Sequence, residues 1–157
     1  MSVICHDLGC GTYAQDLPLW RSLAATHGAP VLDVGAGTGR VALDLARHGH
    51  SVTALDREPA LLEELVRRAG ELELERDTVL ADARTFELGG RFALCVVPMQ
   101  TIQLLGRSEG RSAFLRCARP HLRPGAMLAV AIAEMLELYE ALDGTPRRSR
   151  TSASAAV

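Results

Sequence analysis

The sequence predicts an α/β fold in which a doubly wound parallel sheet carries helices on both faces. Short apolar runs alternate with amphipathic helical segments along the chain, as is typical of parallel sheets with right-handed crossovers. A glycine-rich turn follows the first apolar run, and an acidic residue ends the second. Together these features predict a parallel sheet that binds a ligand at its carboxyl edge.

Each expected element has its own local pattern. Buried strands are predicted at the apolar runs 30–34, 51–55, 78–81, 92–97 and 126–133. Helices are predicted where apolar residues share one face, over 17–27, 38–47, 59–70 and 112–119. Gly49 can cap the second of these helices, and Pro59 opens the third. Pro120 interrupts the stripe of the last one, so this helix is expected to stop or kink there.

Composition limits the class of protein. The 157 residues suit one domain, and a net charge of −2 gives no basic footprint for nucleic acid. No apolar run reaches membrane-spanning length and the start does not resemble a secretory signal, so no membrane partner and a cytoplasmic location are expected. Cys5, His6 and Cys10 have no second ligand pair, so no metal site is predicted. Cys95 and Cys117 are interpreted as core thiols.

The stretch from Asp33 to Gly39 carries the strongest chemical signal. A strand ends, the glycines form a turn, and a helix begins, which leaves backbone N–H groups free to meet a ligand. Asp56 ends the next strand, 17 residues beyond Gly39. In Rossmann-like folds an acid at this place binds ribose hydroxyls. The alternative is that Asp56 only caps the helix that Pro59 opens.

Two details of this turn favour S-adenosylmethionine over a nicotinamide dinucleotide. The third glycine of the dinucleotide pattern would fall at position 40, but Arg40 stands there and Gly39 comes one place early. Asp33 lies two residues before Gly35. A carboxylate at that point can receive the ammonium group of a bound amino acid, whereas it would repel a pyrophosphate.

With these motifs, the sequence resembles the class I S-adenosylmethionine-dependent methyltransferases over about residues 28–134. Asp33–Gly39 resembles the first motif of that family, Ala54–Asp56 the second and Ala81–Ala83 the third. Phe92–Pro98 resembles the fourth strand with its acceptor-side turn, and Leu122–Gly125 the turn before the fifth strand.

The resemblance implies a set of cofactor-binding residues. In the family the acid of the third motif meets the adenine amino group and the next amide meets a ring nitrogen, while a tyrosine of the cap can cover the cofactor. The predicted set is Tyr13, Asp33, Gly35, Ala36, Gly37, Gly39, Asp56, Arg57, Asp82, Ala83 and Val97. Two of these have structural alternatives, because Asp82 can simply cap a loop and Tyr13 can simply pack under the cap helix.

The resemblance implies a methyltransferase that acts on a small-molecule acceptor. Gln100 and Gln103 follow the fourth strand, where they either contact the acceptor or belong only to the loop. No Asp-Pro-Pro-Tyr-like motif follows that strand, which argues against methylation of DNA amino groups. No catalytic residue is assigned, and His6 and His121 are interpreted as surface residues. The alternatives are an inactive cofactor-binding remnant and an NAD-binding Rossmann domain.

The expected organisation is a cap segment over 1–29, a methyltransferase domain over 30–143 and a disordered tail over 144–157. Residues 134–142 predict one more helix, and the Arg/Ser/Ala-rich tail has no apolar periodicity. The resemblance implies a Rossmann-like sheet of strand order 3-2-1-4-5. The family sheet has two further strands for which no segment remains, so a shortened member is expected. An uncovered fifth strand would be an adhesive edge, which predicts a homodimer through that edge.

Overall fold

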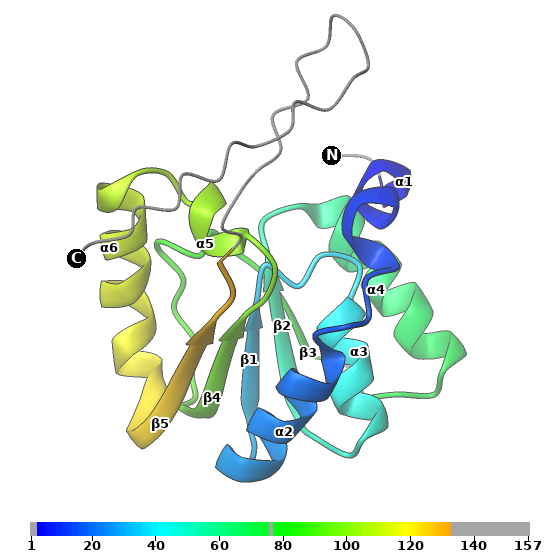
Figure 1. Cartoon of the computed structure of the whole chain (residues 1–157), viewed down its shortest axis with the longest axis horizontal. Helices are drawn as coiled ribbons and strands as arrows, with labels where there is room; N and C mark the ends of the chain where they lie inside the picture. The colour runs from blue at the N-terminus through cyan, green and yellow to red at the C-terminus, as the bar shows by residue number, and fades with distance from the viewer. Residues whose placement is uncertain (1–2, 76, 133–157) are drawn as a thin grey trace, which may run out of the picture.

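Five parallel strands form one sheet in the order β3-β2-β1-β4-β5 (Figure 1). The computed structural model describes residues 3–75 and 77–132. The strands are β1 (Val31–Val34), β2 (Val52–Asp56), β3 (Asp77–Leu80), β4 (Phe92–Val97) and β5 (Leu122–Val130). The fold class and strand order predicted from the sequence are therefore confirmed.

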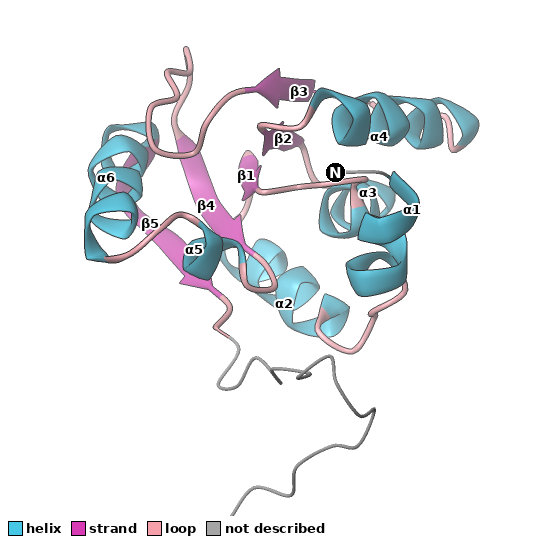
Figure 2. Cartoon of the chain, turned by 90° about the horizontal axis from the view of Figure 1, so that it is seen from above, coloured by secondary structure: helices cyan, strands magenta, loops and turns pink. Residues whose placement is uncertain are grey.

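Helices cover both faces of this sheet, as the view from above shows (Figure 2). One face carries α2 (Leu17–His27), α3 (Arg40–Arg47) and α4 (Pro59–Glu71). The other carries α5 (Thr101–Leu104) and α6 (Ser108–Ala118), which a 3₁₀ turn over Arg119–His121 follows. At the N-terminus, α1 (Val3–His6) continues into a π-helical turn, η1 (Asp7–Gly11), and α1 contacts α4 beside the carboxyl ends of the strands.

Alternating side chains of the central strands supply the two halves of the core. Leu32 and Val34 point to the face covered by α6, where Phe114 is fully buried. Val31 points to the opposite face and packs with Trp20 of α2. Because side chains alternate along a strand, Asp33 near the end of β1 points to the same face as Val31. A charged residue therefore stands where the pattern places a core residue.

Two predicted elements had wrong boundaries, and the other predicted elements agree within two residues. β5 ends at Val130 rather than at residue 133. β5 begins at Leu122 rather than at residue 126, because its first residues pair with β4 across a shift of register. Gly125, with φ of 79°, lies in this irregular stretch, which reads in sequence as a turn. Helix α6 begins at Ser108 rather than at residue 112, since its polar first turn carries no apolar pattern.

Several elements lie outside what the sequence predicted or outside what the structure describes. The short elements α1, η1 and α5 were not predicted, because none has enough apolar residues to show a period. The predicted helix over 134–142 and the predicted tail over 144–157 fall outside the described residues, and so does the segment that would hold any further strand. Within the described part, no helix is long and apolar enough to cross a membrane.

We expect Gly110→Ala to destabilise the fold. Gly110 lies in the first turn of α6, and a Cβ atom there would overlap the backbone carbonyl of Leu105. Because that neighbour is backbone, the helix itself must shift, at a cost of about 1–3 kcal/mol. Chemical denaturation should show the loss, whereas Gly89→Ala, which meets no atom within 4 Å, should be nearly neutral. Equal effects of the two variants would contradict this reading.

Candidate cofactor site

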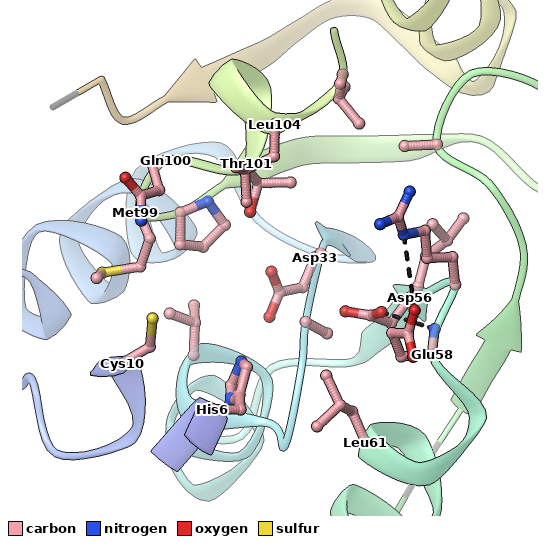
Figure 3. Close-up of a pocket in the computed structure, with 18 of the residues that line it drawn as sticks. His6, Cys10, Asp33, Asp56, Glu58, Leu61, Met99, Gln100, Thr101 and Leu104 are labelled. Atoms are coloured by element: carbon pink, nitrogen blue, oxygen red, sulfur yellow. Dashed lines mark hydrogen bonds and ion pairs between the residues drawn. The ribbon is translucent and has the colours of Figure 1, made fainter. Parts of the chain in front are cut away.

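A cavity of about 350 Å³ opens at the carboxyl ends of the strands, where the strand order reverses between β1 and β4. Ligands of open α/β sheets bind at such a switch point. Its walls come from the glycine-rich turn, the ends of β2 and β3, the turn after β4 and the N-terminal segment (Figure 3). Among the predicted residues, those that line it are Asp33, Gly35, Ala36, Asp56, Arg57, Asp82, Ala83 and Gln100.

Asp33 is the most unusual residue of this cavity. It has no exposed surface, and neither carboxylate oxygen has a hydrogen-bond partner within the described residues. Burial raises the pKa of Asp33 to about 7, against the opposing charge of Arg40. Its carboxylate points into the cavity (Figure 3). A buried acid without a partner is costly, so the site has the properties expected of a place for a cationic group.

Asp56 fixes the shape of the glycine-rich turn. Its carboxylate accepts hydrogen bonds from the backbone N–H of Gly37 at 2.8 Å and of Glu58 at 3.0 Å. The first of these joins the ends of β1 and β2, and the second shapes the turn before α4. A carboxylate can accept about four hydrogen bonds, so Asp56 retains acceptor capacity toward the cavity that it lines. Glu58, not Asp56, is the N-cap residue of α4 and no described side chain caps that helix, so Asp56 shapes the turn before the helix, and ribose binding stays a prediction.

Asp82 is engaged by its own loop. It accepts hydrogen bonds from the backbone N–H of Arg84 at 2.8 Å and from the guanidinium group at 2.6 Å. These bonds to Arg84 hold the pKa of Asp82 at about 2. The loop-capping alternative is therefore realised in this structure, and adenine binding by Asp82 stays a prediction.

Four residues of the predicted cofactor-binding set do not line the cavity, and neither does the acceptor-side candidate Gln103. Val97 is fully buried in the core. The guanidinium carbon of Arg40 lies over the ring of Tyr13, 5.6 Å from the ring centroid. Tyr13 lines a separate groove. Gly37 packs against His6, and Gly39, at the start of α3, would place a Cβ atom 2.7 Å from Leu65 of α4. For these two glycines the structure supplies a packing reason, and their contact with a cofactor stays a prediction.

Sequence reasoning missed part of the cavity wall. His6, interpreted as a surface residue, instead lines the cavity together with Cys10. Their segment shows no apolar period, so no signal in the sequence could have placed it there. Met99 also lines the cavity, with a φ of 56° that is rare for a long side chain and is concentrated at functional sites.

The interpretation of His121 as a surface residue was wrong. His121 is buried, its Nε2 accepts the backbone N–H of Leu88 at 2.9 Å, and its Nδ1 lies 2.9 Å from the carbonyl oxygen of Cys117. This histidine therefore joins a loop to the end of α6 and lies outside the cavity. Cys95 is buried as predicted, and Cys117 is partly buried against the same core cluster. No group of metal-binding side chains occurs within the described residues.

Comparison with known proteins gives the family. A model of the methyltransferase domain matches residues 31–125, which include every strand of the sheet up to the start of β5. The chain belongs to the methyltransferase domain family. This result confirms the resemblance to class I S-adenosylmethionine-dependent methyltransferases, whose motifs border the cavity described above.

This chain spans about half the length of each methyltransferase in the following comparisons. A probable cobalt-precorrin-6B C(15)-methyltransferase of Methanothermobacter thermautotrophicus is 31% identical over 71% of this chain and 56% of its own. The CcbJ methyltransferase of Streptomyces caelestis is 30% identical, with a TM-score of 0.65 over 74% of this chain and 49% of that one. The glycopeptide N-methyltransferase MtfA, solved with S-adenosylmethionine, is 26% identical, with a TM-score of 0.64 over 76% and 55%.

Proposed function

We propose that this chain binds S-adenosylmethionine in the cavity at the end of β1 and transfers its methyl group to a small-molecule acceptor. Asp33 carries this proposal, because ionising a buried carboxyl group without a hydrogen-bond partner is costly and a bound cation would offset that cost. The cofactor's amino-acid end bears an ammonium group that meets this requirement. The cavity volume of about 350 Å³ falls in the range of small-molecule sites.

The lining residues fit the remaining parts of this cofactor. The backbone of Gly35 and Ala36 offers close approach at the glycine-rich turn, and Asp56 offers acceptor oxygens for ribose hydroxyls. The loop of Asp82 and Ala83 lines the cavity and is the proposed place for adenine, as the family's third motif implies. When bound, the cofactor supplies a methyl group on positively charged sulfur, so the protein must mainly align the acceptor and exclude water.

The acceptor end is the part of the cavity away from Asp56. Its wall is formed by Cys10, Met99, Gln100 and Leu104, which offer apolar surface and one amide. Such a wall suits a small organic acceptor rather than a polyanion. A homodimer through the outer edge of β5 and the absence of nucleic-acid binding stay predictions, which size-exclusion chromatography and a DNA-binding assay would test.

Calorimetric titration with S-adenosylhomocysteine, using NAD as the competitor cofactor, tests the proposal. Binding of S-adenosylhomocysteine without binding of NAD is the expected result, because the carboxylate of Asp33 beside the glycine-rich turn would repel a pyrophosphate. Binding of NAD alone would favour the dinucleotide alternative and overturn the proposal. Binding of neither would mean that the chain has lost its cofactor site, and would overturn the proposal.

Gly35→Ala should weaken this binding. Gly35 has a φ of 75°, and a Cβ atom there would lie 2.5 Å from Cγ2 and 2.6 Å from Oγ1 of Thr101. Because a β-branched side chain moves little, we expect a loss of about 1–3 kcal/mol in stability and at least about tenfold in affinity. Gly28→Ala is the matched control, since Gly28 has a φ of 82° and no neighbour within 4 Å. If both variants bind S-adenosylhomocysteine equally well, the turn does not contact the cofactor.

A further inference from the structure

The N-terminal segment 3–11, here called the strap, covers one side of the cofactor cavity. His6, Gly9 and Cys10 of the strap line the cavity (Figure 3). The imidazole of His6 packs directly on Gly37, so that a side chain at position 37 would overlap it. The strap therefore touches both the cavity and the glycine-rich turn.

Apolar burial does not hold the strap in place. Ile4 is 73% exposed and Leu8 is 81% exposed, so its two large aliphatic side chains face solvent. None of the strap side chains that the structure describes is buried. Since the hydrophobic effect scales with the apolar area removed from water, it contributes little here.

One polar cluster fastens the strap to the rest of the fold. Asp7 accepts a hydrogen bond from Oγ1 of Thr38, at 2.8 Å, and pairs with the guanidinium group of Arg68 in α4. Arg68 is itself held by Glu64, whose Oε1 lies 2.7 Å from its Nε. Burial alone would raise the pKa of Asp7, but the bonds from Arg68 and Thr38 outweigh it and lower that pKa below its usual value. Asp7 is therefore ionised and paired near neutral pH.

A second and more deeply buried cluster anchors the chain just beyond the strap. Arg40 donates to both carboxylate oxygens of Asp16 and to the carbonyl oxygen of Tyr13, and Trp20 donates to Asp16 at 2.8 Å. The side chain of Arg40 is only 8% exposed, compared with 30% for Arg68. Solvent weakens ion pairs, so the cluster of Asp7 separates more easily than the cluster of Asp16. Tyr13 already belongs to the second cluster, so the exposed Thr12, between the strap and Tyr13, is the place for a hinge.

We propose that Asp7 is a positioning residue that fastens the strap over the cofactor, and that the strap opens at Asp7 while Asp16 stays anchored. This inference rests on the proposed function, because it makes the opening of the strap a route by which S-adenosylmethionine enters and leaves. Asp7 acts through His6 and Cys10, which it holds against the cavity.

The test compares Asp7→Asn and Arg68→Gln with the wild-type chain. Hydrogen exchange of residues 3–11 and the dissociation rate of S-adenosylhomocysteine are both measured. Each variant should exchange faster in the strap and release the ligand about tenfold faster, the effect of losing one charge-assisted hydrogen bond. Because the two residues act as one pair, the double variant should lose little more than either single variant.

Arg67→Gln is the matched control. Arg67 is the neighbour of Arg68 on α4 and pairs with Glu64 and Glu71, whereas the ion pairs of Asp7 are with His6 and Arg68. It should leave exchange and ligand release unchanged. If the wild-type chain fails to bind S-adenosylhomocysteine, the proposed function falls and the strap with it. If the wild-type chain binds and Asp7→Asn releases the ligand at the wild-type rate, or if the two single effects simply add, the strap alone is refuted.

Discussion

Replacing Asp33 by asparagine is expected to stabilise the chain at pH 8 while it removes the binding of S-adenosylhomocysteine. The Asp33 carboxylate is buried and has no partner within the described residues. An ionised carboxylate in that position opposes folding, whereas the neutral amide has nearly the same shape without the charge. In the proposed function, the same carboxylate pairs with the ammonium group of the ligand. Its loss should weaken binding at least about 100-fold.

The pH dependence of stability follows from the raised pKa of Asp33. Burial raises it from 3.8 to about 7 in the folded chain. Between these values the folded state holds a proton that the unfolded state has released, so the free energy of unfolding falls as pH rises from about 4 to about 7. One pKa unit corresponds to about 1.4 kcal/mol, so the three units make a loss of about 4 kcal/mol. The asparagine variant lacks this loss and should match the wild-type chain only at low pH.

Urea denaturation at pH 5 and pH 8 measures this difference directly. Asp44→Asn is the informative control, because Asp44 is also buried but pairs with Arg21 through bonds of 2.6 and 2.7 Å. Removing that partnered charge should destabilise the chain, the opposite sign to Asp33→Asn. A loss of stability in Asp33→Asn at pH 8 would mean that the charge of Asp33 is compensated in the folded chain.

The fold was predictable because its determinants are local. The apolar runs that become β1 and β4 and the stripes of α2 and α4 each show their period in the sequence, and the predicted bounds agree within two residues. The glycine-rich turn and the strand-end acid Asp56 were found for the same reason. Where a boundary depends on tertiary pairing, as at the irregular start of β5, the local pattern gives the wrong residue.

The missed part of the site depends on contacts distant in sequence. Asp7 bonds to Thr38 and Arg68, which lie 31 and 61 positions away in the sequence. No local sequence pattern around either partner predicts a contact with the N-terminal segment. His6, which lines the cavity, is the chain neighbour of Asp7 in this cluster. Charge pairs of this kind have no period along the chain, so composition and spacing could not reveal them.

Asp56→Ala is expected to destabilise the chain and to weaken cofactor binding together. Its carboxylate satisfies the backbone N–H groups of Gly37 and Glu58, and both amides lose their partner in the variant. A part-buried donor left without an acceptor costs about 1–3 kcal/mol, and we expect about 2 kcal/mol in total. Denaturation gives this loss, and titration with S-adenosylhomocysteine gives the accompanying loss of affinity. Asp56→Asn, which keeps one acceptor oxygen, should fall between the alanine variant and the wild-type chain.

The two aspartates should therefore separate stability from binding within one cavity. The carboxylate of Asp33 has no hydrogen-bond partner among the described residues, so removing its charge should raise the free energy of unfolding. Asp56 already holds two amides, so its removal releases the turn on which any cofactor must rest. If Asp56→Ala keeps wild-type stability, the turn is held by its glycines and strands alone. If it loses stability but keeps affinity for S-adenosylhomocysteine, Asp56 shapes the turn without contacting ribose.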